Sequence, residues 1–209
     1  MLDVRKIRLT LELREMGISN SSVLSAIEKI PRQVFIPESF RNQAYENIAL
    51  PIGQDQTISQ PYIVALMTQS LEIKKEHKIL ELGTGTGYQS SILSLLCRRV
   101  YTIERIKSLL LIAEKNFKEL KLTNIVTKHA DGNFGWNEQI PFDRIIFTAA
   151  TKKIPEILFN HISDNGIIVA PVIEGSKQIL KKFSKINKKI SSEILTNVLF
   201  VPNLSGVKN

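Results

Sequence analysis

The stretch 78–88, KILELGTGTGY, decides the fold. Its first five residues, KILEL, form a short apolar run of the length typical of a buried strand. Glycines then alternate with threonines at Gly83, Gly85 and Gly87, and a helix-forming segment begins at Tyr88. In an open parallel sheet a ligand binds beyond the carboxyl ends of the strands, where a glycine-rich turn lets it approach the backbone closely. The stretch therefore predicts a strand, a ligand-binding turn and a helix.

Strand-like and helix-like segments continue to alternate on both sides of this turn. We expect strands at 78–82, 100–103, 125–129, 144–147 and 166–171, with helices at 88–97, 109–120 and 155–161. This alternation is typical of βαβ units and of a parallel sheet that is covered on both faces. Two further strand-like runs, 179–183 and 194–201, have no helix between them. We therefore predict an α/β fold with a doubly wound, mostly parallel sheet and a C-terminal antiparallel hairpin.

The first 76 residues are expected to form a helical N-terminal extension and a loop. A loosely amphipathic segment begins the chain, a short helix after Ser21 must stop before Pro31, and 62–71 has the pattern of a third helix. The polar segment 53–61, GQDQTISQP, is expected to be a loop. No repeat or low-complexity linker divides the chain. We expect one domain over 1–209, in which the extension is 1–76 and the ligand-binding core is 77–209.

Composition excludes several classes of protein. The chain has 209 residues, of which 43% are hydrophobic, more than a disordered chain carries. Its longest apolar run, 166–173, is far shorter than the roughly 20 residues that span a bilayer. The first residues mix charge into every turn, unlike a secretory leader. A lone cysteine, Cys97, and three scattered histidines predict neither a disulfide framework nor a metal site. We expect a cytoplasmic protein that does not enter a membrane.

A basic charge balance raises the question of nucleic acid. The chain has 28 Lys and Arg against 20 Asp and Glu, a formal net charge of +8. Many lysines fall in 177–189, KQILKKFSKINKK, which we interpret as a solvated hairpin whose lysines protect a sheet edge. The charge keeps open the alternative that the chain is an RNA methyltransferase. Against it, the fourth strand ends in Thr148-Ala149-Ala150 and lacks the Asn/Asp-Pro-Pro-aromatic string of enzymes that methylate base amines. Cys97 also lies in the wrong region to act as a nucleophile.

Acidic residues follow two further strands of the core. Glu104 comes 21 residues after Gly83, a position from which a carboxylate can accept both ribose hydroxyls of an adenosine-containing ligand. Asp131-Gly132 follows the third strand and could reach an adenine amino group, although the pair is also an ordinary turn or helix cap. Glu104 has a similar alternative as a solvated strand end beside Arg105. No Walker lysine follows the turn, so the set fits S-adenosylmethionine better than a nucleotide phosphate.

Several strings together resemble the protein-L-isoaspartate O-methyltransferase family of class I methyltransferases. These are ILELGTGTGYQSSILS, VYTIER, PFDRIIFTAA and, above all, QTISQP ahead of the glycine turn. The resemblance runs from IPRQVFIP at 30–37 to LFVPNLSG at 199–206. It implies methyl transfer from S-adenosylmethionine to the free carboxylate of L-isoaspartyl residues in damaged proteins, which starts their repair. It implies isoaspartyl peptides and proteins as partners. We expect a monomer that needs no nucleic acid, although the sequence itself does not reveal the oligomeric state.

The resemblance assigns roles to individual residues. Ser59 matches the active-site serine, within the substrate loop Thr57, Ile58 and Ser59. The matching cofactor positions are Glu81, Gly83, Thr84, Gly85, Gly87, Glu104, Arg105, Asp131 and Gly132. A carboxylate is already ionised at pH 7, so no general base is needed, and the Ser59 hydroxyl can hold one carboxylate oxygen while the other attacks. Without the resemblance, a helix cap beside Pro61 would explain Ser59 as well.

One place departs from the family pattern. Gln54-Asp55 stands where the family usually has His-Gly before QTIS. If Asp55 points inward, its charge repels an incoming carboxylate; if it points outward, it only shapes the loop. A cofactor-binding paralogue with an altered substrate is a further alternative, which the retained Thr57, Ile58, Ser59 and Pro61 argue against.

Overall fold

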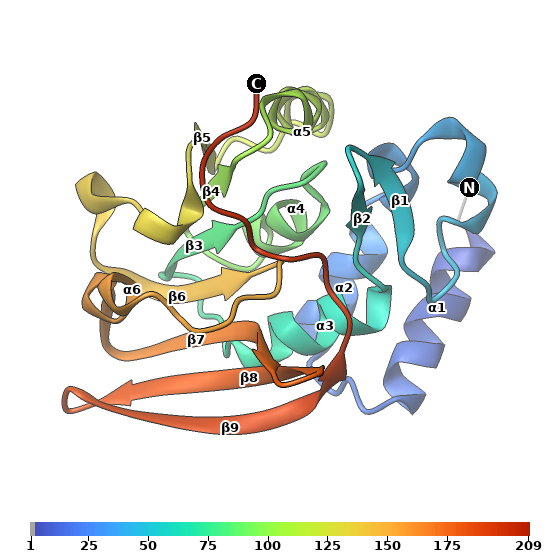
Figure 1. The fold of residues 1–209 in the computed structure, drawn as a ribbon. Coiled ribbons are helices and arrows are strands. Elements are labelled where there is room, and N and C mark those ends of the chain that lie inside the picture. The colour runs from blue at the N-terminus through green and yellow to red at the C-terminus, as the bar shows by residue number, and fades with distance from the viewer. Residues whose placement is uncertain (1–2) are drawn as a thin grey trace.

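A seven-stranded sheet forms the centre of the computed structural model, which describes residues 3–209 (Figure 1). The strands are β3 (Lys78–Leu82), β4 (Arg99–Glu104), β5 (Ile125–His129), β6 (Phe142–Phe147), β7 (Ile162–Glu174), β8 (Lys177–Ile186) and β9 (Lys189–Val198). Their spatial order is β5-β4-β3-β6-β7-β8-β9. Pairs from β5 to β7 are parallel, whereas β7–β8 and β8–β9 are antiparallel. The predicted doubly wound α/β fold with a C-terminal hairpin is confirmed.

Helices cover the two faces of the sheet because successive strand residues point to opposite sides. Ile79 joins α3 (Pro61–Ser70) and α4 (Tyr88–Ser94) in one apolar cluster. Leu80 and Leu82 join a second cluster on the other face, which includes α6 (Glu156–His161). The helix α5 (Lys107–Glu119) packs against β4 and β5. These layers leave the carboxyl ends of the parallel strands as the place where loops from many elements meet.

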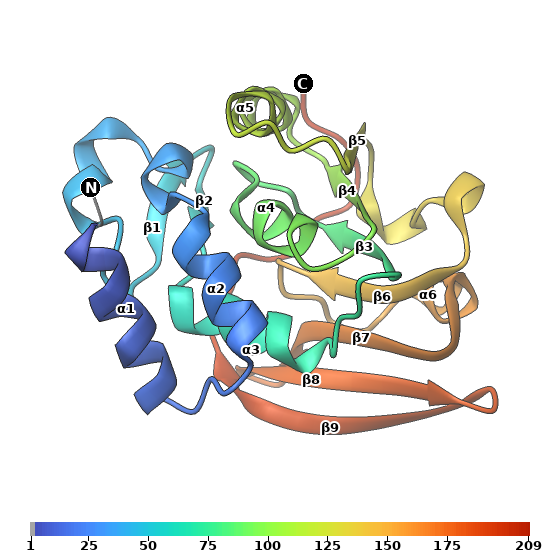
Figure 2. The same ribbon diagram turned by 180° about the vertical axis from the view of Figure 1, so that it is seen from behind.

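The N-terminal extension packs against the helices that flank the glycine turn. It contains α1 (Val4–Glu15), α2 (Ser21–Lys29) and the short 3-10 helices Arg32–Phe35 and Glu38–Gln43. The Asn20 side chain caps α2 by accepting hydrogen bonds from two backbone N–H groups of its first turn. In the view from behind, α2 lies between α1 and α4 (Figure 2). One apolar cluster joins these helices to residues of α4 and α5, so the extension is fixed directly beside the turn.

The segment expected to be a polar loop is a β-hairpin, so that expectation is wrong for most of its length. β1 (Leu50–Gly53) and β2 (Gln56–Ile58) pair antiparallel and enclose a two-residue turn. Gln54 and Asp55 both have left-handed backbone angles, φ 55° and 57°, as a type I′ turn requires. Neither residue is the glycine or asparagine that marks such turns in a sequence. The substrate loop is therefore held in a defined register.

Several other boundaries differ from expectation, among them those of α4 and β9. The helix α4 ends at Ser94, so Cys97 lies in the turn that follows it. The last strand runs from Lys189 to Val198 and not from 194 to 201, because the turn of the hairpin falls at Asn187 and Lys188. Lysines alternate only partly with apolar residues there, so the sequence carries a weak strand signal.

Beyond β9, residues 199–208 form an extended segment that we call the strap. It crosses the carboxyl ends of the parallel strands and ends beside α5, as the red coil in Figure 1 shows. The Ala150 N–H donates to the Val201 carbonyl at 2.8 Å, and farther along the Lys107 N–H donates to the Lys208 carbonyl at 2.9 Å. The strap therefore joins β6 to α5 over the sheet edge.

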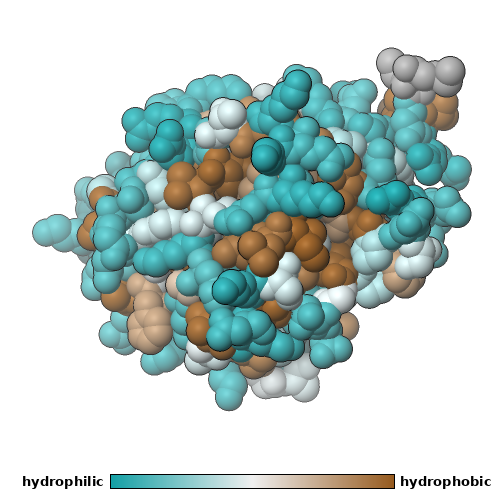
Figure 3. All heavy atoms as spheres, turned by 90° about the horizontal axis from the view of Figure 1, so that it is seen from above, coloured by the Kyte–Doolittle hydropathy of each residue, from teal (hydrophilic) through white to brown (hydrophobic). Residues whose placement is uncertain are grey.

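The outer surface is largely hydrophilic. Seen from above, polar side chains cover most of that face, with apolar ones gathered toward its middle (Figure 3). No helix within residues 3–209 combines the length and the hydropathy needed to cross a bilayer. In the same range no three His, Cys, Asp or Glu side chains come together to bind a metal ion.

Candidate active site

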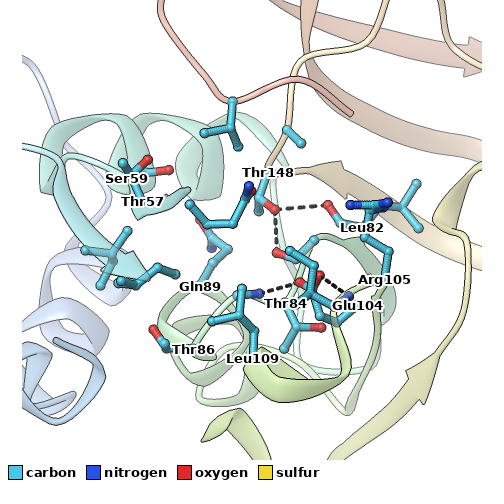
Figure 4. Close-up of a pocket in the computed structure, with 18 of the residues that line it drawn as sticks. Thr57, Ser59, Leu82, Thr84, Thr86, Gln89, Glu104, Arg105, Leu109 and Thr148 are labelled. Carbon is cyan, nitrogen blue, oxygen red and sulfur yellow. Dashed lines mark hydrogen bonds between the residues drawn. The ribbon is translucent and has the colours of Figure 1, made fainter. Parts of the chain in front are cut away.

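A cleft opens at the carboxyl ends of β3, β4 and β6, and we call it the main cleft. It encloses about 990 Å³, a volume that includes the open solvent at its mouth. Its wall comes from the glycine turn, the β1–β2 hairpin, the start of α5 and the strap. Figure 4 shows Ser59 and Thr57 on one side of this space and Thr148, Thr84 and Glu104 on the other.

The glycine turn is the floor of the main cleft, and two of its glycines have no substitute. Gly83 and Gly87 have φ of +101° and +98°, in the left-handed region that L-residues rarely adopt. A Cβ on Gly83 would collide with the Thr148 hydroxyl, and one on Gly87 would collide with the ring of Phe117. At these two positions the turn packs directly against Thr148 and Phe117. Gly83, Thr84 and Gly85 also line the cleft, where a ligand can approach the backbone.

Glu104 ends β4 with its carboxylate at the wall of the main cleft. One oxygen accepts a hydrogen bond from the Gly85 N–H at 2.8 Å, and the other accepts one from the Ile106 N–H at 2.9 Å. The side chain is 5% exposed, and burial raises its pKa, although the hydrogen bonds from the backbone oppose that shift. Each oxygen keeps a further lone pair for a hydroxyl donor. The expected ribose-binding carboxylate thus also fixes the glycine turn.

Most of the predicted site residues line the main cleft. The cofactor positions that do so are Gly83, Thr84, Gly85, Glu104, Arg105 and Gly132. The substrate-loop residues Thr57, Ile58 and Ser59 line it as well. The fold therefore brings together residues that are up to 75 positions apart in the sequence, from Thr57 to Gly132.

Glu81, Gly87 and Asp131 lie behind the wall. Glu81 is fully buried beneath the turn, where its carboxyl accepts from the Ser90 and Thr102 hydroxyls, and burial raises its pKa to about 8. Asp131 caps a 3-10 helix by accepting from the Asn133 N–H at 2.9 Å, and its second oxygen accepts from the Gly206 N–H of the strap at 2.6 Å. A direct contact of these three residues with the cofactor stays a prediction.

A second cleft, which we call the side cleft, adjoins the main cleft. Neutral residues line it, drawn from 47–49, the start of α3 and the segment 197–201. The two clefts share Thr57, Ser59, Thr148 and Val201, and we call this place the shared opening. The Ser59 hydroxyl is half-buried there and makes no hydrogen bond to any residue in the described range 3–209. It is available to bind a ligand.

The helix-cap alternative for Ser59 and the inward orientation of Asp55 both fail. Gln60, not Ser59, is the N-cap of α3, and Pro61 begins the helix. Asp55 is exposed at the tip of the hairpin and belongs to the wall of neither cleft. Asp55 therefore points away from the space that an anionic substrate would occupy.

Some wall residues were not anticipated from the sequence. Tyr88 and Gln89, which open α4, line the main cleft, as do Asn203 and Leu204 of the strap. Thr148 lines both clefts, and its place directly after a parallel strand was the signal that could have revealed it. For the strap no such local signal exists.

Comparison with known proteins agrees with this geometry. A family model described as protein-L-isoaspartate (D-aspartate) O-methyltransferase matches residues 4–208. The chain is 50% identical over 205 residues to the protein-L-isoaspartate O-methyltransferase of Paramagnetospirillum magneticum, with 97% of this chain and 96% of that one covered. It is 46% identical over 204 residues to the enzyme of the same name from Maricaulis maris, with 98% and 96% covered.

Solved structures give the same result. A protein-L-isoaspartate O-methyltransferase superposes with a TM-score of 0.89 at 25% identity, covering 98% of this chain and 67% of that one. A β-aspartate methyltransferase from Plasmodium falciparum, in complex with S-adenosyl-L-homocysteine, superposes with a TM-score of 0.83 at 24% identity, covering 94% and 97%. The full-length match and the 50% identity settle the family: this chain belongs to the protein-L-isoaspartate O-methyltransferases.

Proposed function

We propose that this chain methylates the free carboxylate of L-isoaspartyl residues at the shared opening, with S-adenosylmethionine in the main cleft and the peptide in the side cleft. The observation that carries the proposal is that Ser59 lines both clefts, and that the main cleft, on the other side of this opening, also contains the glycine turn. Methyl transfer needs the donor and acceptor in line and a few ångströms apart. Two clefts with a common wall supply that arrangement without a large movement.

The groups in the main cleft fit S-adenosylmethionine. Gly83, Thr84 and Gly85 line the cleft, and Gly83 leaves no room for a side chain beside Thr148, so the backbone of the turn forms the floor against which the ligand lies. The Glu104 carboxylate is placed to accept hydrogen bonds from the two ribose hydroxyls, and the apolar Ile106 and Leu109 beside it offer a surface for a planar base. When bound, S-adenosylmethionine supplies an electrophilic methyl group on a positively charged sulfur.

The protein's part in the reaction is placement and exclusion of water. An isoaspartyl carboxylate is ionised at neutral pH, so the site needs no base to activate it. The Ser59 hydroxyl donates a hydrogen bond to one carboxylate oxygen, which directs the other toward the main cleft. Because opposite charges cancel as the methyl group moves, a cleft with few water molecules favours the step. The ester product is neutral, so the hydrogen bond that it accepts from the Ser59 hydroxyl is weaker than the one that the carboxylate accepted.

Methyl transfer to a matched pair of peptides tests the proposal. The enzyme is expected to label an isoaspartyl peptide at least about tenfold faster than its aspartyl twin, because a displaced carboxylate loses the in-line geometry. Ser59→Ala is expected to lower labelling by about 1 to 3 kcal/mol, or roughly 5- to 150-fold, with S-adenosylmethionine affinity changed only a few-fold. Ser192→Ala, on the exposed strand β9, is the control. Equal labelling of the two peptides would refute the proposal.

We also propose that the chain acts as a monomer in the cytoplasm, without nucleic acid or membrane. Residues of a single chain are sufficient to build both clefts, which is consistent with a monomer. Several lysines of the 177–189 stretch are already engaged. Lys182 pairs with Glu72 and Glu193, and Lys185 donates to main-chain carbonyls at 2.8 and 3.0 Å. The expectation that the lysines of this stretch protect a sheet edge is wrong for Lys182 and Lys185, because β8 pairs with β7 and β9 and the edge strand is β9.

A further inference from the structure

Thr148 and Ser59 face the shared opening with opposite hydrogen-bonding character. Both side chains line both clefts, and Figure 4 shows Thr148 on the side of the glycine turn with Ser59 across from it. The Thr148 hydroxyl donates to the carbonyl of Gly83 and lies 3.0 Å from the carbonyl of Leu82. The Leu82 carbonyl in turn accepts the Thr148 N–H at 3.0 Å.

A hydroxyl has one hydrogen, and that of Thr148 is committed to the backbone. Its remaining lone pairs can therefore only accept. These lone pairs make a region of negative potential on one side of the opening. A carboxylate is repelled from such a region, whereas a cation is attracted to it. The unpaired hydroxyl of Ser59 is the donor that an anion requires.

The position of the Thr148 oxygen is fixed by close packing. A Cβ on Gly83 would collide with this oxygen, so the close approach of the two residues requires glycine at 83. Thr148 is half-buried at the end of β6, whose preceding residues are fully buried in the sheet. The oxygen is therefore held against the glycine turn by both its hydrogen bonds and its neighbours.

We propose that Thr148 is a positioning residue whose oxygen faces the sulfonium centre of S-adenosylmethionine and accepts a weak C–H···O contact from the methyl group that is transferred. This rests on the proposed function and adds a polarity to the opening. Thr148 attracts the cationic donor, and Ser59 binds the anionic acceptor. A methyl group on a positive sulfur is polarised, and contacts of this kind contribute about 0.5 to 1 kcal/mol each. The methyl group is thereby aimed from Thr148 toward the carboxylate.

Comparing two ligands that differ in charge tests this role. S-adenosylmethionine carries the sulfonium, whereas S-adenosylhomocysteine has a neutral sulfur and no methyl group. Thr148→Val removes the oxygen and keeps the shape. It is expected to weaken S-adenosylmethionine binding by about 2- to 5-fold and to leave S-adenosylhomocysteine binding nearly unchanged. Thr148→Ser keeps the oxygen and is expected to restore the wild-type ratio of the two dissociation constants. Calorimetry measures all of these values.

Three outcomes would overturn the inference. Equal weakening of both ligands in Thr148→Val means that the hydroxyl only shapes the turn. Unchanged affinities mean that it has no role, and a shifted ratio in Thr148→Ser means that the oxygen is not the cause. Thr148→Ala provides the same ratio if valine packs poorly. The calorimetry uses no peptide, so it is independent of the substrate test. If Thr148→Val shifts the ratio of the two dissociation constants as expected while the enzyme labels isoaspartyl and aspartyl peptides equally, the proposed substrate is refuted and the role of Thr148 stands.

Discussion

Glu104 connects the ligand to the turn that binds it. Its two oxygens accept from the Gly85 and Ile106 N–H groups and remain open to hydroxyl donors in the main cleft. Glu104→Ala is expected to weaken S-adenosylmethionine binding by tenfold or more, because charge-assisted hydrogen bonds contribute about 1.5 to 3 kcal/mol each. Glu104→Gln is expected to lose less. Calorimetry with the exposed Glu138→Ala as control measures the difference, and an unchanged dissociation constant would place the ribose elsewhere.

Glu81 makes stability depend on pH. Burial raises the pKa of its carboxyl from the ordinary 4.5 to about 8. Between these values the folded chain holds a proton that the unfolded chain has lost, so stability decreases as pH rises through this window. The uncharged Glu81→Gln variant is expected to lose less thermal stability than the wild type between about pH 5 and pH 8. Melting temperatures across that range measure the effect, and parallel curves for the two proteins would contradict it.

At the scale of elements, the β1–β2 hairpin places Ser59 while its tip stays outside the site. Asp55→Gly is expected to leave kcat/KM for an isoaspartyl peptide within about 2-fold at low and high salt, because Asp55 lines neither cleft. Stability is expected to rise by about 0.5 kcal/mol, since glycine adopts the φ of 57° without strain. Asp55→Asn removes the charge and keeps the left-handed preference. A gain in activity at low salt in both variants would revive charge repulsion.

The sequence was sufficient where a single element carries the signal. β3 and β5 lie at the residues expected, because each is a short run that begins with β-branched or apolar residues and lies between turns. The β1–β2 hairpin was missed because Gln54 and Asp55 lack the usual turn chemistry. Thr102 and Thr84, which connect Glu81 to the glycine turn by hydroxyl contacts of 2.7 Å, are polar residues that only the folded neighbourhood explains. Site residues at strand ends can be predicted from the sequence, whereas residues that join the site only through tertiary packing cannot.

At the scale of the whole molecule, the strap completes the main cleft from the far side of the sheet. Asn203 and Leu204 contribute to the wall, and Asp131 binds the Gly206 N–H. A chain shortened after Pro202 is expected to bind S-adenosylmethionine at least about tenfold more weakly, because it loses part of the wall and this tie. Lys208→Ala, which removes only a side-chain contact with Gln54, is the matched control and is expected to bind normally. Equal affinity of the shortened chain would show that the strap is not needed.

The four residues shared by the two clefts also govern the sequence of events in a catalytic cycle. Each cleft reaches solvent by itself, and the two meet only at Thr57, Ser59, Thr148 and Val201. With the cofactor in the main cleft and the peptide in the side cleft, as proposed above, neither has to pass the other to reach its place. Either can therefore arrive first, and the demethylated cofactor can be exchanged while the peptide stays seated. A protein chain carrying several lesions close together is thus open to successive methylation without full release.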